Sequence, residues 1–164
     1  MKKIIYIALV VFVSIATAKA QDAQYAKDLM NRKDVTISQI PVLLLDKASL
    51  IQKFGQPLSV SPYFNEMQNI QGDFYNYNGV RFYVERGWVM NFVVTGKQYS
   101  ITPHNIKVGD NINKLKPYFP ISFKNMKANS KGYVVGVNIK DEDSFLYVQA
   151  DTHYIITKIS VISY

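Results

Sequence analysis

Two stretches of the chain follow the same pattern at a fixed distance of 64 residues. Each has an aliphatic lead, an aspartate suited to the N-cap of a helix, and a short apolar stripe at helical spacing. Agreement at both the helix start and the helix face is hard to obtain by chance, so it predicts two copies of one structural unit. The matched pairs are Asp46 and Asp110, Ala48 and Ile112, Ile51 and Leu115, and Phe54 and Tyr118.

Both predicted helices are short. Asp46 caps the first, Gly55 supplies the left-handed residue that ends it, and Pro57 prevents its continuation. The second, from Asp110, is expected to be shorter or kinked because Pro117 interrupts it. Helices of this length are not stable alone, so each is expected to pack on a sheet. The side chains expected to be buried beneath the sheets are Ile51, Phe54, Ile112 and Leu115.

Each helix is followed by segments with the period-2 alternation of antiparallel strands. Asn78-Gly79 and Arg86-Gly87 mark tight hairpin turns in the first copy, and polar turns separate the strands of the second. The strands also match between the copies, with three extra residues in the second hairpin. The sequence therefore predicts an α+β fold of two tandem helix-plus-antiparallel-sheet repeats, at 35–101 and 102–164, with both helices on one side of the sheets.

The first 20 residues have the pattern of a secretory signal peptide. Lys2 and Lys3 precede an apolar run at residues 4–15, and Ala18-Lys19-Ala20 fits a small-x-small cleavage site. The run is shorter than the roughly 20 apolar residues that cross a membrane, so no membrane span is expected after cleavage. The chain contains no cysteine to carry a lipid. We predict a periplasmic or extracellular protein that is not a lipoprotein, with residues 21–34 leading into the first repeat.

The charge of the exported chain is mildly basic. Removal of residues 1–20 takes away three lysines and no acid, so the formal net charge falls from +7 to +4. The remaining lysines and arginines occur singly along the chain, whereas nucleic-acid binders gather them on one face. We therefore expect no nucleic-acid partner.

The sequence around the first helix and the last strand of the first sheet resembles a known unit. The run Ile51-Gln52-Lys53-Phe54-Gly55-Gln56-Pro57, followed by an aromatic strand and Arg86-Gly87-Trp88-Val89-Met90-Asn91-Phe92, resembles the SmpA/OmlA (BamE-like) unit. Two such units in one exported chain are similar to the architecture of beta-lactamase inhibitory proteins. BamE-like proteins are lipoproteins and the inhibitors carry disulfides, and this chain lacks the cysteine for either. The resemblance implies a non-catalytic exported protein that presents a sheet face to another envelope or extracellular protein.

Catalytic and metal-binding signatures are weak. Asp141-Glu142-Asp143 is the densest carboxylate cluster, but it lacks the glycine and glutamate positions of a calcium loop and is typical of a solvated turn. The two histidines, His104 and His153, lie 49 residues apart and outside any zinc-ligand spacing. We expect no cofactor and no metal. The alternatives are a small envelope hydrolase using Asp141, Asp143 or His153, and a structural envelope component.

Tyrosine is the residue type that most favours a binding role. Eleven of the 12 tyrosines follow the signal peptide, and six of these lie on predicted strands. Tyrosine suits a half-exposed sheet face that contacts another protein, because its ring is apolar and its tip is polar. Strand propensity alone also enriches tyrosine, so both interpretations stay open. The candidate protein-binding residues are Tyr75, Tyr77, Tyr83, Tyr133, Tyr147 and Tyr154.

Overall fold

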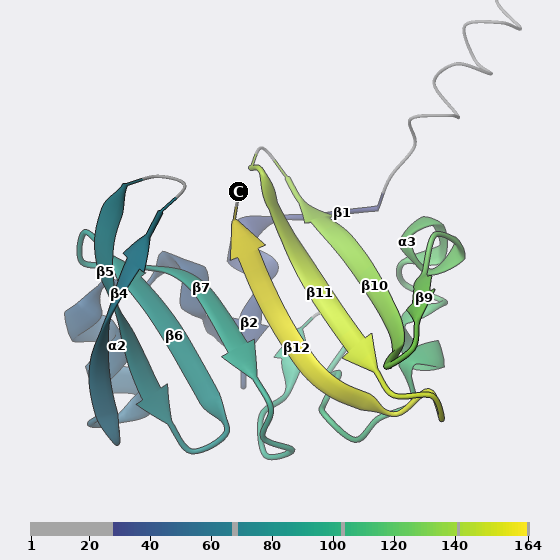
Figure 1. Ribbon diagram of the computed structural model, residues 1–164, viewed down its shortest axis with the longest axis horizontal. Coiled ribbons are helices and arrows are strands. Elements are labelled where there is room, and N and C mark those ends of the chain that lie inside the picture. The colour runs from purple at the N-terminus through teal and green to yellow at the C-terminus, as the bar shows by residue number, and fades with distance from the viewer. Residues whose placement is uncertain (1–27, 67–68, 103, 141, 164) are drawn as a thin grey trace, which may run out of the picture.

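A computed structural model describes residues 28–66, 69–102, 104–140 and 142–163 (Figure 1). These residues form one nine-stranded sheet and one three-stranded sheet, with short helical segments beside them. The predicted signal peptide at 1–20 and the first half of the predicted lead-in, residues 21–27, lie outside the described residues. Within the described residues, no helix combines the length and the hydropathy that crossing a membrane requires.

The first half of the large sheet is an antiparallel meander. It comprises β4 (Ser59–Asn65), β5 (Ile70–Tyr77), β6 (Val80–Glu85) and β7 (Trp88–Val94), each paired with the next. The predicted turns at Asn78-Gly79 and Arg86-Gly87 are both confirmed, with φ of 77° at Gly79 and 85° at Gly87. Glycine adopts these positive angles without the steric penalty that other residues incur, which is why the hairpins turn there.

The second half is also a meander, and it joins the first directly. It comprises β9 (Lys127–Asn129), β10 (Gly132–Ile139), β11 (Ser144–Ala150) and β12 (Ile156–Ser163). β12 pairs with β7 through three residue pairs, so the sheet runs β1-β10-β11-β12-β7-β6-β5-β4, with β9 also pairing β10. β1 (Leu29–Met30) adds a short parallel strand beside β10.

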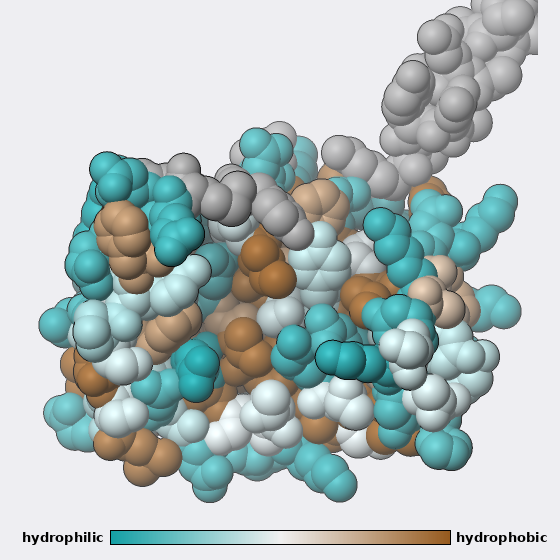
Figure 2. Space-filling view, viewed as in Figure 1, coloured by the Kyte–Doolittle hydropathy of each residue, from teal (hydrophilic) through white to brown (hydrophobic). Residues whose placement is uncertain are grey.

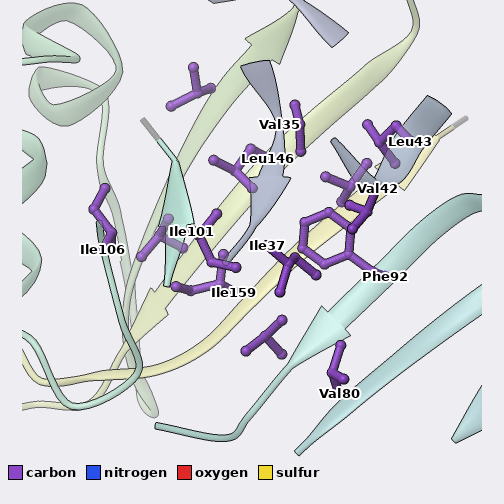
Figure 3. Packing of buried hydrophobic residues seen from close by; sticks show 14 of the residues in the cluster. Val35, Ile37, Val42, Leu43, Val80, Phe92, Ile101, Ile106, Leu146 and Ile159 are labelled. Atoms are coloured by element: carbon purple, nitrogen blue, oxygen red, sulfur yellow. The ribbon is translucent and has the colours of Figure 1, made fainter. Parts of the chain in front are cut away.

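One face of the large sheet is covered by small elements. They include η1 (Arg32–Asp34), β2 (Thr36–Ile37), β3 (Ile40–Pro41), η2 (Val42–Leu44), α2 (Lys47–Phe54) and β8 (Ile101–Thr102). Figure 1 shows α2 and β2 behind the sheet. Figure 3 shows aliphatic side chains of β2, η2 and β8 packed against the inward side chains of β7, β11 and β12. We call the covered side the core face and the opposite side the open face.

The first predicted helix is confirmed. The Asp46 side chain accepts a hydrogen bond from the Ser49 backbone N–H at 2.7 Å, and α2 ends at Gly55 with φ of 80°. Leu50 is the fully buried residue of α2, whereas Ile51 and Phe54 are partly buried. The helix is therefore rotated slightly from the predicted orientation.

The second predicted helix does not form. Residues Ile112–Leu115 make the 3-10 turn η3, capped by Asn111 rather than by Asp110. In an α-helix the Asn113 carbonyl would accept a hydrogen bond from the backbone N–H of residue 117, but Pro117 has no N–H. The Lys116 N–H donates to that carbonyl instead, at 3.1 Å, which is the 3-10 pattern. A separate five-residue helix, α3 (Pro120–Lys124), follows. Ile112 and Leu115 are nevertheless fully buried, as predicted.

The prediction of two tandem helix-plus-sheet repeats is wrong. The two meanders share one continuous, mostly antiparallel sheet, because the outer edges of β7 and β12 pair instead of remaining separate. The helix expected in the second copy is replaced by η3 and α3, and strand residues far outnumber helical residues in the fold. The boundary predicted between residues 101 and 102 falls inside β8, and the division of the chain at that point stays a prediction.

Candidate functional site

The open face is the side of the large sheet that the described residues leave largely uncovered. Among the described residues, α3 and β9 border it beside β10, and no element crosses its centre (Figure 1). Figure 2 shows this face, where apolar side chains gather in a hollow over β7 and β12. An antiparallel sheet commonly leaves one face in contact with solvent, and the side chains on that face are then usually polar. An apolar hollow on such a face is therefore a candidate binding site.

A cleft of about 260 Å³ opens on this face between β4 and β12. Strand pairing places its side chains, because alternate residues of β4, β5, β6, β7 and β12 point the same way. Its residues include three aromatic rings, one guanidinium and two aliphatic groups. They are Tyr63, Phe74, Tyr83, Arg81, Val93 and Ile162.

The three aromatic rings form one cluster at the β4 side of the cleft. The centre of the Tyr63 ring lies 4.5 Å from the centre of the Phe74 ring and 5.0 Å from that of Tyr83. The Tyr63–Tyr83 contact is edge-to-face, with an angle of 83° between the ring planes. Phe74 and Tyr83 are 5.7 Å apart. Such edge-to-face pairs are stabilising and hold the rings in place. Tyr63 nevertheless remains 39% exposed, so the cluster presents a preformed aromatic surface to solvent.

Gly72 makes room for the innermost ring. A Cβ atom at this position would lie 2.5 Å from Cε2 of Tyr83 and 2.7 Å from its hydroxyl. The Tyr83 ring therefore lies directly over the backbone of β5, which only glycine permits. The shape of the cleft depends on this close approach.

Tyr83 is also fixed by a buried carboxylate. Its hydroxyl donates to Oε2 of Glu85 at 3.1 Å, and both side chains are buried. Burial and the hydrogen bond with Glu85 raise the pKa of Tyr83 to about 12. Tyr83 is thus a neutral donor at ordinary pH, and its role in the site is to position the ring.

Arg81 supplies the charge of the cleft. Its Nε donates to Oδ1 of Asn76 at 2.7 Å, and its guanidinium carbon lies 5.1 Å from the centre of the Phe74 ring. The ion pairs within the described residues join other groups, Arg32 to Glu142 and Lys114 to Asp110. Arg81 is therefore an oriented cation with no acidic partner among the described residues.

The far wall of the cleft crosses the junction of the two meanders. Oδ1 of Asn91 accepts from both the backbone N–H and the hydroxyl of Ser163, at 3.0 and 2.9 Å. Ile162 on β12 faces the cleft from the second meander and is 40% exposed. The cleft thus belongs to the assembled sheet and to neither meander alone.

A second hollow of about 230 Å³ lies at the other end of the open face, between α3 and the strands β10 and β11. Like the cleft, it contains an aromatic ring packed closely on a glycine, because a Cβ on Gly136 would lie 3.0 Å from the Tyr147 ring. Lys127 and Phe145 also line it. The open face therefore holds an aromatic ring packed on a glycine at each end.

The six predicted tyrosines do not form one face. Tyr83 lines the cleft and Tyr147 lines the second hollow. Tyr75 is buried, and Tyr75 and Tyr77 belong to the core cluster on the other side of the sheet. The rings of Tyr133 and Tyr154 stack on each other near the start of β10, with their centres 4.2 Å apart. The protein-binding role of the set stays a prediction, and the structure brings only two of its members to the open face.

Sequence reasoning missed the residues that build the cleft. Tyr63 lies on β4, a strand that was not predicted, while Phe74 and Arg81 lie on predicted strands without having been selected. The run from Ser59 to Pro62 alternates serine with apolar residues, and that short period-2 signal was the available clue. Its Pro62 masked the signal, although proline is tolerated on an edge strand.

The acid and histidine candidates are dispersed. Asp141 lies outside the described residues, Glu142 pairs with Arg32 at 2.6 Å, and Asp143 and His153 are exposed. The His104 ring stacks on Tyr118 at 3.2 Å, and burial lowers its pKa. Among the described residues, no group of three or more histidine or acidic side chains is arranged to hold a metal ion.

Comparison with known proteins gives a fold and no family. No protein-family description matches the sequence, and no curated protein matches it. Two solved structures are similar to the fold. One is an extracellular protein containing an SCP domain from Bacillus anthracis, with TM-score 0.53, 15% identity, and 72% of this chain aligned to 43% of that one. The other is a cysteine-rich secretory protein from Staphylococcus aureus, with TM-score 0.55, 12% identity, and 85% of this chain aligned to 50% of that one.

These neighbours correct the resemblance drawn from sequence. The fold is similar to part of a protein that contains an SCP domain and to part of a cysteine-rich secretory protein. The resemblance to SmpA/OmlA units and beta-lactamase inhibitory proteins is therefore wrong. The short helix with its Gly-x-Pro stop occurs as predicted, but it is a local motif that many folds contain. The chain spans half or less of the length of these neighbours.

Proposed function

We propose that this chain is an exported, non-catalytic binding protein that binds another protein through the open face of its sheet. The predicted signal peptide supports export, and the fold neighbours are described as extracellular and secretory proteins. The observation that carries the proposal is the aromatic cleft on the open face. Aromatic residues and arginine are enriched where proteins bind one another, and a rigid pocket of this kind loses little entropy on binding.

The alternatives receive less support. A hydrolase needs an acid and a base that converge on one reacting atom. Asp143 and His153 are exposed, and neither lines the cleft. A structural envelope component would use the same open face, and it differs from a binding protein only in the number of copies that assemble.

Site-specific photo-crosslinking tests the proposal. A photoreactive phenylalanine at Val93, inside the cleft, is incubated with the exported proteins of the source cells and irradiated. The matched control carries the same group at Lys53, an exposed residue of α2 on the covered side of the sheet. We expect a discrete heterologous product from Val93, reduced several-fold by Tyr63→Ala, and none from Lys53. Equal products from both positions, or a product from neither, would overturn the proposal.

A further inference from the structure

We infer that the cleft recognises an acidic segment of its partner, in which a carboxylate lies next to an apolar side chain. The inference rests on the proposed function and specifies its ligand. Arg81 would bind the carboxylate, and the aromatic cluster with Ile162 would receive the neighbouring apolar group. Three features of the site support this assignment: the orientation of Arg81, the charge around it, and the size of the cleft.

The orientation of Arg81 leaves one side of its guanidinium free. Nε is engaged by Asn76, and the plane is held near the Phe74 ring. Within the described residues, the two terminal nitrogens have no hydrogen-bond acceptor. A planar guanidinium with two free N–H groups side by side matches the two oxygens of a carboxylate. Because its position is already fixed, little side-chain entropy is lost when the carboxylate binds.

The surrounding charge favours an anion over a cation. Two acidic side chains act on Tyr83 beside the cleft: Glu85 is buried and accepts a hydrogen bond from the Tyr83 hydroxyl, and Asp73 lies within electrostatic range of it. Neither lines the cleft, and neither forms an ion pair with Arg81 among the described residues. Aromatic rings also attract cations, but Arg81 already lies over Phe74 and would repel a second positive charge there. The chain as a whole has an excess of positive charge. Charge complementarity therefore selects an acidic partner.

The size of the cleft sets the scale of the apolar group. Sites for whole small molecules run from about 300 to 1,000 Å³, and this cleft of about 260 Å³ lies just below that range. It is open to solvent along the sheet and is lined by apolar surface at Val93 and Ile162. One aromatic or aliphatic side chain beside the carboxylate fits this volume.

Three probes that share one ring separate the possible ligands. 3-Phenylpropionate carries a carboxylate, 3-phenylpropanamide is neutral, and 3-phenylpropylammonium is a cation. Each is titrated into the ¹⁵N-labelled protein while the backbone amide signals are followed. We expect the carboxylate to shift the amides of Arg81, Asn91 and Ile162, the amide analogue to bind at least about fivefold more weakly, and the ammonium to leave these signals unchanged.

Paired variants assign the preference to Arg81. Arg81→Gln should bind the carboxylate and the amide probes equally, whereas Lys127→Gln, which removes the same charge beside the second hollow, should keep the preference. Arg81→Lys keeps the charge but loses the planar pair of N–H donors, so its preference for the carboxylate probe over the amide probe should be intermediate. The amide spectrum of each free variant reports whether it is folded.

The inference is overturned if Arg81→Gln retains the preference for the carboxylate, if the ammonium probe binds, or if the shifts fall outside the cleft. The crosslinking experiment separates this inference from the proposed function. A Val93 product that forms equally with Arg81→Gln would keep the binding role and refute the acidic ligand.

Discussion

Replacement of Tyr83 by phenylalanine isolates the hydrogen bond that fixes the cleft. The ring of Tyr83 and its packing on Gly72 remain, while Glu85 keeps its buried position and loses its donor. A hydrogen bond to a charged group contributes about 1.5–3 kcal/mol, and an unsatisfied buried acceptor costs a similar amount. We therefore expect Tyr83→Phe to lower the free energy of unfolding by about 2 kcal/mol at pH 7.

Urea denaturation followed by tryptophan fluorescence measures this loss. For a domain of this size the dependence on urea is about 2 kcal/mol per molar, so the midpoint should fall by about 1 M. Tyr63→Phe is the control, because the Tyr63 hydroxyl has no hydrogen-bond partner among the described residues and the ring lies in the same cluster. Its midpoint should stay within about 0.3 M of the parent protein. Equal midpoints for the two variants would refute the reasoning.

Alkaline pH gives the same test a second readout. The pKa of Tyr83 is raised to about 12 in the folded protein, above its ordinary value near 10. Folding is therefore favoured while Tyr83 is protonated: this stabilisation is complete below pH 10 and is lost as pH rises to 12. The difference in stability between the parent protein and Tyr83→Phe should narrow across that window. A constant difference from pH 9 to 12 would contradict the assignment.

Two further substitutions test the packing of the sheet. Ser160 on β12 is 2% exposed and its hydroxyl has no hydrogen-bond partner among the residues that the structure describes, so Ser160→Ala should leave the melting temperature unchanged or raise it slightly; a loss of several degrees would reveal a missing partner. Gly132 and Gly55 both have positive φ, but a Cβ on Gly132 would overlap the Ala150 carbonyl while one on Gly55 has open space. Gly55→Ala should therefore cost about 1–2 kcal/mol and Gly132→Ala clearly more, as measured by urea denaturation; similar costs would show that backbone strain alone decides.

Local structure was largely predictable from the sequence. The cap at Asp46, the end of the helix at Gly55, and the turns at Asn78-Gly79 and Arg86-Gly87 all occur where predicted. Each depends on one or two residues whose conformational preference is strong. Strands with clear alternation, such as β7 and β10, were recognised for the same reason.

The failures were at the level of long-range pairing. A match at offset 64 between Asp46 and Asp110 says nothing about whether the following strands form two sheets or one, since pairing of β7 with β12 is decided by which edges meet. The single proline at Pro117 was enough to replace the second helix by a 3-10 turn. The cleft was missed because it is assembled from five strands that no local pattern connects.

The junction between β7 and β12 has a consequence for how the protein folds. Its three residue pairs join positions 65 to 69 apart in the chain, whereas each hairpin of the two meanders joins neighbours across a short turn. Closing so long a loop carries an entropic cost that local hairpins do not bear, so the meanders should form early and the junction late. A chain that has formed both meanders but not the junction has two unpaired strand edges, at β7 and β12. That intermediate is the species most exposed to aggregation, and the cleft comes into existence only when it disappears.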